Sequence, residues 1–328
     1  MVLLALLAGC SSDDDRLTVY SGRTADLIEP LLEQFTDDTG IEVDLLAGDS
    51  TDMALTIREE GEKTKADVFL SQSPGAMGVL ADTGLLRPVD ESLIGRLVDP
   101  TNAAPDRTWV GLSGRKRVLA YNTDRLSDAE LPDSVLEVTQ PRFNGRLGVA
   151  PTNASFQDFV TAMRATLGED RTRQWLADVV GSGVHTYANN VAILEAIARG
   201  EIDVGLVNHY YAYRKLAEDP ASPVANHHFA DGDVGSLVLV TSAALVQRDG
   251  QDSDTAERAG RLMDYLLSEP AQRYFADQTF EYPLVKGIPP QALVPPEEGL
   301  RSEQVDPAHL EGGIEGTLGL IREAGLST

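Results

Sequence analysis

Apolar residues recur along the chain with two alternating periods. Short apolar runs have the length of buried strands, and the longer segments between them carry apolar residues at helical spacing. Alternation of this kind predicts a parallel sheet covered by helices. In the first part of the chain, the expected strands are 17–20, 41–46 and 66–70, and the expected helices are 26–40, 53–62 and 75–84.

A second alternating series follows the first, and it predicts a second α/β lobe. Two apolar segments without a helical period, 109–120 and 236–240, flank this series, and we expect both to be crossover strands. Within the series the expected strands are 146–150 and 202–207, and the expected helices are 156–167, 171–181 and 191–199. Helices are also expected at 256–267, 269–277 and 313–324, with the proline-rich segment 283–298 on the surface.

The crossover strands set the predicted division of the chain. The first lobe is discontinuous and takes residues 16–116 and 236–280. The second lobe takes residues 117–235 and 281–328.

Composition narrows the class of partner. The chain has 328 residues, 42% of them hydrophobic, which is enough for a large core in one or two domains. Its 52 acidic and 27 basic residues give a net charge of −25, which repels nucleic acid and anionic lipid. We therefore expect neither as a partner, and we expect a monomer.

The first ten residues, MVLLALLAGC, form an apolar run that ends in Cys10. The run resembles a bacterial lipobox, which is cut before a cysteine that becomes acylated. We therefore expect residues 1–15 to be a lipoprotein signal remnant and tether, Cys10 to be the site of lipid attachment, and the protein to be extracytoplasmic. The alternative is an ordinary buried N-terminal segment. Because Cys10 is the only cysteine, disulfides, cysteine-based zinc sites and thiol catalysis are excluded elsewhere in the chain.

Sequence signatures of common enzymes are missing from the chain. It contains no G-x-S-x-G elbow, no P-loop, no H-E-x-x-H and no G-x-G-x-x-G after a strand. The pair His227 and His228 is a poor metal site, because adjacent side chains on a strand point to opposite faces and no third ligand follows at a suitable spacing. We do not expect an enzyme, and the alternative of an anchored hydrolase predicts turnover.

Tyr210 and Tyr211 are the main candidates for metal ligands. They follow the apolar run 202–207 and Asn208. A phenol normally titrates near pH ~10, but a trivalent cation favours the phenolate, which is a hard and charged oxygen ligand. Two such oxygens suit ferric iron, and the lack of thiols argues against copper(I) or zinc. The alternative is one core aromatic residue and one half-buried neighbour at the start of a helix.

Residues 152–155 join an expected strand to an expected helix. Backbone N–H groups and the macrodipole at a helix N-terminus favour negative charge, so this junction is a candidate anion site. Thr152 and Ser155 are equally compatible with ordinary helix caps.

Six ordered landmarks point to a known family: VYSGRT at 19–24, ADVFLSQ at 66–72, GLSGRKRVLAYN at 111–122, APTNASF at 150–156, YANN at 187–190 and GLVNHYYAYR at 205–214. On these residues the chain resembles the ferric-iron-binding periplasmic proteins, which are the extracytoplasmic solute-binding components of iron(III) ABC importers. The resemblance spans nearly the whole chain. It implies a two-lobed α/β periplasmic-binding-protein fold, with two crossover strands and a cleft that closes on iron. It also implies delivery of iron to an ABC permease.

The resemblance implies roles for individual residues. Tyr210 and Tyr211 match the paired tyrosine ligands of ferric iron, Fe3+. In this family an anion such as carbonate or phosphate often completes the iron shell. The positions that match its pocket are Asn153, Ala154, Ser155, Asn190 and Asn208, and Arg115 and Arg117 match basic residues near the site.

The first lobe departs from the family pattern. Many members carry a histidine where Thr24 stands and a glutamate where Gln72 stands, and others carry a tyrosine at the position of Ala25. A third tyrosine of some members is missing, and Phe156 is the nearest residue to it. An anion, water or the chelating group of an iron chelate therefore has to complete the shell.

Two further residues are candidates for a place around the ligands. Arg23 is placed to contact an anion from the opposing lobe, although an arginine at a helix entry is more often solvated. His209 precedes the tyrosines and is a candidate for a supporting contact. The alternative function with the same architecture is a receptor for an oxyanion or a small phosphorylated or carboxylated solute.

Overall fold

The first lobe is an α/β unit built from the N-terminal part of the chain and from a later segment that contains residues 253–277. The computed structural model describes residues 16–81, 83–296 and 314–326. The elements of this lobe are β1 (Leu17–Ser21), α1 (Ala25–Thr39), β2 (Val43–Ala47), α2 (Ser50–Glu60), β3 (Val68–Ser71), α3 (Pro74–Ala81), β4 (Leu86–Arg87), α4 (Glu91–Ile94), α9 (Ser253–Leu266) and α10 (Glu269–Asp277). Phe35, Phe69 and Phe275 lie in its core and are fully buried.

The second lobe has its own hydrophobic core, which includes Phe143, Phe159 and Trp175. Its elements are β6 (Leu147–Val149), α5 (Ala154–Leu167), α6 (Glu169–Gly181), β7 (His185–Thr186), α7 (Asn190–Ala198), β8 (Val204–Asn208), α8 (His209–Glu218), β9 (Val224–His227) and α11 (Ile314–Glu323). Short 3-10 helices occupy loops at Gly61–Lys63, Pro100–Asn102, Asp128–Glu130, Val135–Thr139, Pro141–Phe143 and Val234–Ser236.

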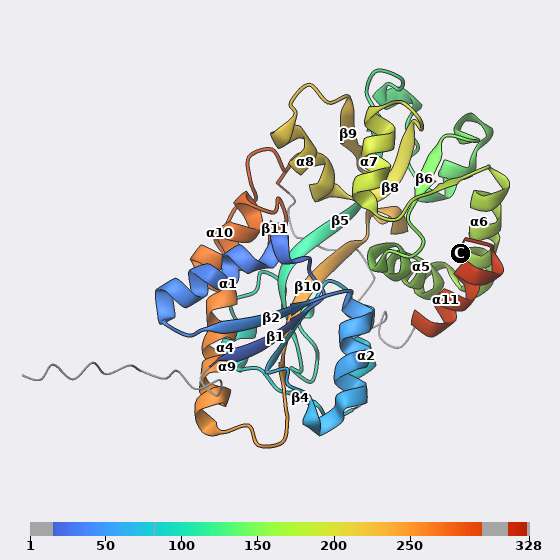
Figure 1. The fold of residues 1–328 in the computed structure, drawn as a ribbon. Helices are drawn as coiled ribbons and strands as arrows, with labels where there is room; N and C mark the ends of the chain where they lie inside the picture. The colour runs from blue at the N-terminus through green and yellow to red at the C-terminus, as the bar shows by residue number, and fades with distance from the viewer. Residues whose placement is uncertain (1–15, 82, 297–313, 327–328) are drawn as a thin grey trace, which may run out of the picture.

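Two long strands cross between the lobes (Figure 1). They are β5 (Val110–Asn122) and β10 (Val238–Val246), which pair antiparallel and carry a bulge between Thr241 and Ser242. The first half of β5 also pairs with β11 (Tyr282–Pro283), and its second half pairs with β8 and β9. The strand order is β2-β1-β3-β10-β5-β8-β6-β7. The crossing strands therefore tie both lobes into one path of strands, as the sequence predicts.

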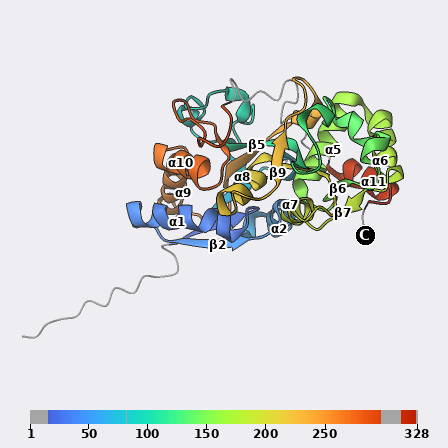
Figure 2. The same cartoon turned by 90° about the horizontal axis from the view of Figure 1, so that it is seen from above.

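The arrangement is elongated, with the crossing strands at its middle. Seen from above, α1, α9 and α10 lie toward one end, and α6 and α11 lie toward the other (Figure 2). None of the helices in the described ranges is long and apolar enough to cross a membrane.

Local sequence signals fix several helix ends. Gly40 ends α1 because it adopts a φ of 71°, and its N–H closes on Thr36 O at 2.8 Å. Asn153 begins α5, because its side chain accepts a hydrogen bond from the N–H of Ser155 at 3.2 Å. Each expected helix and strand of the described chain has a counterpart, but the short strands β4, β7, β9 and β11 and the helices α4 and α8 were not among the expected elements.

The structure changes one part of the predicted division. We expected residues 281–328 in the second lobe, but Leu284 lies in the core of the first lobe. Val98 N–H donates to Leu284 O at 2.8 Å, and Val285 forms a bridge with Leu97. The chain therefore stays on the first lobe beyond residue 280, because β11 pairs with the first half of β5. The predicted lipid attachment at Cys10 falls outside the described residues.

Candidate metal and anion site between the lobes

Tyr210 and Tyr211 lie in the first turn of α8, directly after β8 ends at Asn208. Their rings are stacked with centroids 4.1 Å apart, and Tyr210 is fully buried while Tyr211 is partly buried. The Tyr210 hydroxyl is buried and has no hydrogen-bond partner among the described residues. An unsatisfied buried hydroxyl costs about 1–3 kcal/mol, so this atom is poised to gain a partner.

Charged side chains lie near the buried Tyr210 hydroxyl. Its ring packs with Phe280 and Tyr282, but Arg115 and Glu281 interact with the hydroxyl electrostatically. Burial, followed by the neighbouring Tyr211, raises the pKa of Tyr210 well above its ordinary value. The phenolate therefore needs a strong cationic partner to form, and a trivalent metal ion supplies one.

Arg115 and Arg117 lie two residues apart on β5, and both are 2% exposed. The Arg117 guanidinium donates to Ser155 Oγ at 3.2 Å and to Asn208 Oδ1 at 3.1 Å. Burial, followed by the positive charge of Arg115, lowers the pKa of Arg117 to about 9. Neither bond goes to a carboxylate, so this buried positive charge favours an anionic ligand nearby.

The candidate anion residues gather at the start of α5. Asn153 Oδ1 accepts hydrogen bonds from the Ser155 hydroxyl at 2.5 Å and from Asn190 Nδ2 at 3.3 Å, which joins the starts of α5 and α7. Through Arg117, Ser155 is also connected to Asn208. Asn153, rather than Thr152 or Ser155, is therefore the helix cap. Thr152 and Ala154 flank this network, and Thr152 is exposed.

Arg23 has a different environment from the expected one. It is fully buried, and its guanidinium makes two bonds to Glu281, from NH1 to Oε2 at 3.1 Å and from NH2 to Oε1 at 2.9 Å. NH1 also donates to Thr241 Oγ1 at 3.1 Å, and Ser113 Oγ donates to Glu281. Burial alone would lower the pKa of Arg23, but Glu281 outweighs it and the pKa is raised. Arg23 is thus neither solvated nor free to bind an anionic ligand, because its guanidinium is paired with the Glu281 carboxylate.

His209 packs against Tyr210 and anchors the start of α8. It is fully buried, it stacks on Tyr282 at 4.8 Å, and its Nδ1 accepts a hydrogen bond from Lys116 N at 3.0 Å. Burial lowers the pKa of His209 to about 3, so the ring is neutral near pH ~7.

The first lobe contributes few side-chain groups from the expected positions. Thr24 is exposed at the start of α1, where its side chain makes no capping bond. The backbone oxygen of Gln72 accepts a hydrogen bond from the Arg115 guanidinium. The side-chain Nε2 of Gln72 is buried without a partner among the described residues, so it is a free donor.

Polar side chains on or next to helices of opposite lobes also contact each other. Ser73, which precedes α3, donates from Oγ to Asp158 Oδ1 on α5 at 2.8 Å. On the exposed side, Arg214 of α8 lies 3.6 Å from Asp26 of α1. Asp158 and Glu281 were not predicted from the sequence. The only local signal for Asp158 was its position as a carboxylate on the otherwise apolar inner face of a helix. No local signal marked Glu281.

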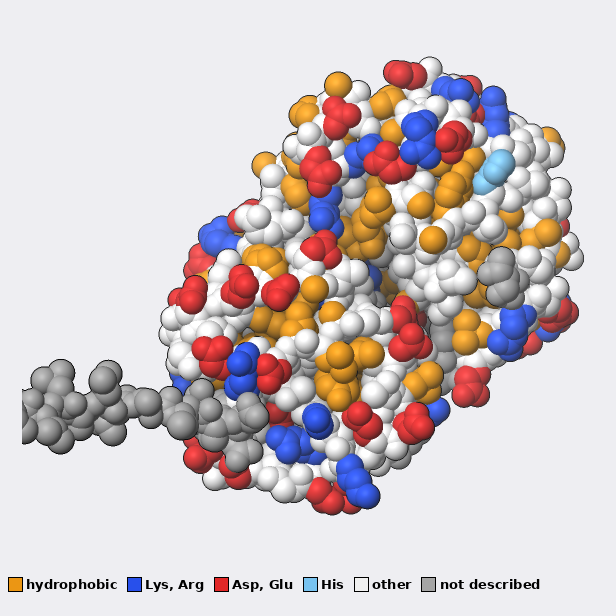
Figure 3. Space-filling view, viewed as in Figure 1, with side chains coloured by type: hydrophobic (Ala, Val, Ile, Leu, Met, Phe, Trp, Pro, Cys, Tyr) orange, Lys and Arg blue, Asp and Glu red, His pale blue; other side chains and the backbone are white. Residues whose placement is uncertain are grey.

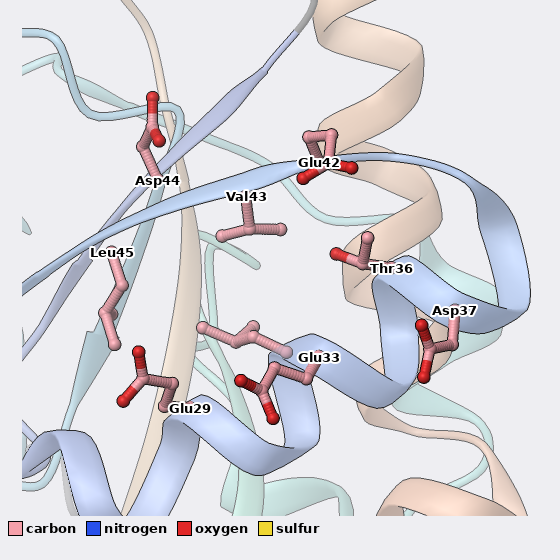
Figure 4. Close-up of a pocket in the computed structure, with 9 residues that line it drawn as sticks. Glu29, Glu33, Thr36, Asp37, Glu42, Val43, Asp44 and Leu45 are labelled. Carbon is pink, nitrogen blue, oxygen red and sulfur yellow. The ribbon is translucent and has the colours of Figure 1, made fainter.

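Figure 3 shows a hollow between the two lobes, lined on this face largely by hydrophobic and uncharged side chains, while charged side chains crowd the outer surfaces. A second groove lies between α1 and β2, lined by Glu29, Glu33, Asp37, Glu42 and Asp44 (Figure 4). Across the described ranges, no three His, Cys, Asp or Glu side chains come close enough to hold a metal ion. This applies to the acidic groove and to His227, whose Nε2 lies 2.8 Å from Pro132 O.

Comparison with known proteins bears on the whole chain. Residues 63–300 match the family described as bacterial extracellular solute-binding protein. The chain is 32% identical to the major ferric iron-binding protein of Neisseria meningitidis serogroup B over 286 residues, covering 86% of this chain and 85% of that protein. It is 27% identical over 328 residues to the Fe(3+)-binding periplasmic protein of Serratia marcescens, covering 99% and 95%. The crystal structure of iron-bound HitA from Pseudomonas aeruginosa superposes with a TM-score of 0.88 at 31% identity, covering 95% and 99%.

Proposed function

This chain belongs to the bacterial extracellular solute-binding proteins, within their ferric-iron-binding group, and we propose that it captures ferric iron through Tyr210 and Tyr211 in the cleft between its lobes. Members of this family bind solutes rather than transform them, so the chain is not an enzyme. It works outside the cytoplasm and hands its iron to an ABC permease. Lipid attachment at Cys10 is part of the proposal.

The observation that carries the proposal is the buried, unpartnered hydroxyl of Tyr210 beside the ring of Tyr211. A phenol of raised pKa does not ionise readily on its own, but a trivalent cation displaces its proton and gains a hard oxygen ligand. His209 fixes the start of α8 through its bond to Lys116 N. The two phenol groups are therefore held in place before a ligand arrives.

The balance of charges at the site supports an anion bound together with the iron. Two phenolates leave ferric iron with one uncompensated positive charge, and Arg115 and Arg117 add two more, of which the nearby Asp158 carboxylate offsets at most one. We propose that carbonate, phosphate or the carboxylates of an iron chelate balance this charge. The pocket for the anion is formed by Thr152, Asn153, Ala154, Ser155, Asn190 and Asn208.

The first lobe favours a chelated ligand over a bare ion. Gln72 presents a buried amide donor where many relatives carry a glutamate, and Thr24 is exposed. A donor repels a metal ion but binds the oxygen of a chelating anion. We therefore propose that an anion occupies the side of the iron that faces the first lobe.

The test is visible spectroscopy of the protein purified with ferric citrate. We expect a phenolate-to-iron charge-transfer band that Tyr210→Phe and Tyr211→Phe each weaken, together with the affinity for iron. Tyr265→Phe is the control, because Tyr265 lies on α9 with its hydroxyl on Asp38 at 3.0 Å. A Tyr210→Phe variant that stays coloured with unchanged affinity contradicts the ligand assignment. A colourless wild type that is thermally stabilised by phosphate alone would favour the oxyanion receptor instead.

A further inference from the structure

Asp158 joins the two lobes at a point that the tyrosine site does not use. We propose that Asp158 is an interlobe latch: its carboxylate on α5 docks on the N-terminus of α3 and holds the lobes closed around the solute. Asp158 is then a positioning residue that sets how long iron is retained, and this role rests on the proposed function above.

The docking geometry is that of a helix cap supplied from the other lobe. Ser73 Oγ donates to Asp158 Oδ1 at 2.8 Å and accepts from Ala76 N at 3.2 Å within α3. The N–H of Gly75 is also directed at the carboxylate. The N-terminus of a helix carries a partial positive charge, so a carboxylate is the side chain that it binds best.

The carboxylate of Asp158 is 1% exposed, although it joins two separate hydrophobic cores. Burying a carboxylate is costly unless charged and hydrogen-bonding groups surround it. Arg115 of β5 attracts it, and Asp49, the cap of α2, repels it. Ser73 and Asp158 belong to different lobes, so this bond exists only while the lobes are together. The latch therefore stabilises the closed arrangement alone.

The latch adjoins the candidate anion pocket. Asp158 lies one helical turn after Ser155, whose hydroxyl contacts Arg117 at 3.2 Å. On the opposite lobe, Gln72 precedes Ser73 and binds the Arg115 guanidinium through its backbone oxygen. Opening the latch thus separates the two groups of residues that flank the pocket.

The experiment compares Asp158→Ala, Ser73→Ala and the double variant, each loaded with ferric citrate. Release of iron to a competing chelator is followed by stopped flow on the visible band. We expect each single change to raise the release rate about tenfold or more, which is the effect of losing a hydrogen bond to a charged group. The double variant should release iron about as fast as Asp158→Ala, because the two groups share one bond. The wavelength of the band should not move.

Asp26→Asn is the matched control, because it removes another interlobe contact at an exposed position, where ion pairs contribute little. We expect its release rate to stay within about threefold of wild type. Asp158→Asn keeps the side-chain volume and serves if the alanine variant does not fold. Release at the wild-type rate in both Asp158 variants, or single effects that multiply in the double variant, overturns the latch.

Small-angle scattering of the iron-free protein separates this inference from the proposed function. We expect a larger radius of gyration for Asp158→Ala than for wild type, and equal radii count against the latch. If wild type gives no coloured complex with ferric iron, the proposed function fails, while the scattering comparison still tests the latch.

Discussion

Glu281→Gln should destabilise the protein strongly, because it breaks a fully buried ion pair. The Glu281 and Arg23 side chains are both 0% exposed, with NH2 and Oε1 2.9 Å apart. Removing one partner of such a pair leaves an uncompensated buried charge and costs about 3–5 kcal/mol. A glutamine also turns amide hydrogens toward the guanidinium of Arg23, so part of the hydrogen bonding is lost as well.

This loss of about 3–5 kcal/mol is a large fraction of the total stability of a domain, which is about 5–15 kcal/mol. Urea unfolding of the iron-free protein, followed by far-ultraviolet circular dichroism, measures it directly. Glu269→Gln is the control, because Glu269 pairs with Arg273 at an exposed site on α10, and we expect a loss within about 0.5 kcal/mol. A Glu281→Gln variant that loses less than about 1 kcal/mol would refute the reasoning.

A double variant tests whether the charge itself causes the loss. Arg23→Met with Glu281→Leu removes both charges, and such replacements are often neutral or stabilising. Thr241 and Ser113 then keep buried hydroxyls without their present partners, at about 1–3 kcal/mol each. We therefore expect the double variant to recover only part of the stability that Glu281→Gln loses.

Two further predictions concern pH and packing. Burial raises the pKa of Asp158 to about 7, above its value in the unfolded chain, so the native protein binds the proton more tightly than the unfolded chain does. The contribution of Asp158 to stability therefore falls as pH rises from about 4 to about 7. The difference in unfolding free energy between wild type and Asp158→Asn should therefore fall by about 1–3 kcal/mol between pH 5 and pH 8, and a flat difference contradicts the assignment. Gly205→Ala should cost about 1–3 kcal/mol in urea unfolding, because its Cβ would lie 2.2 Å from Ile193 Cγ2. Gly260→Ala on α9, where nothing lies within 4 Å of the added Cβ, should instead leave stability unchanged or raise it.

The fold was predictable because its helices and strands are long enough to show their period. The 13 residues of β5 and the apolar runs at β1, β3 and β8 are recognisable on their own. Strands of two residues such as β7 and β11 carry no period, and only their pairing partners define them.

The candidate site was predictable where neighbouring residues carry the signal. Tyr210 and Tyr211 are adjacent, and Asn153 and Ser155 share one helix start. Asp158 and Glu281 depend on partners 85 and 258 residues away, so no local pattern identifies their contacts. The same distance explains why Arg23 was expected to be solvated or to face an anion, although it faces Glu281.

The placement of Arg115 and Arg117 on β5 affects how a solute first meets the protein. Both residues lie where β5 passes from its pairing with β10 to its pairing with β8. In the closure that we propose, the lobes rotate about the crossing strands, so we expect the two guanidinium groups to lie near the rotation axis and to move little. The tyrosines and the start of α3 belong to opposite lobes and would separate in this motion. If the lobes open as the proposed function requires, the positive charge of Arg115 and Arg117 stays at the base of the cleft, where we expect an anionic chelate to bind first.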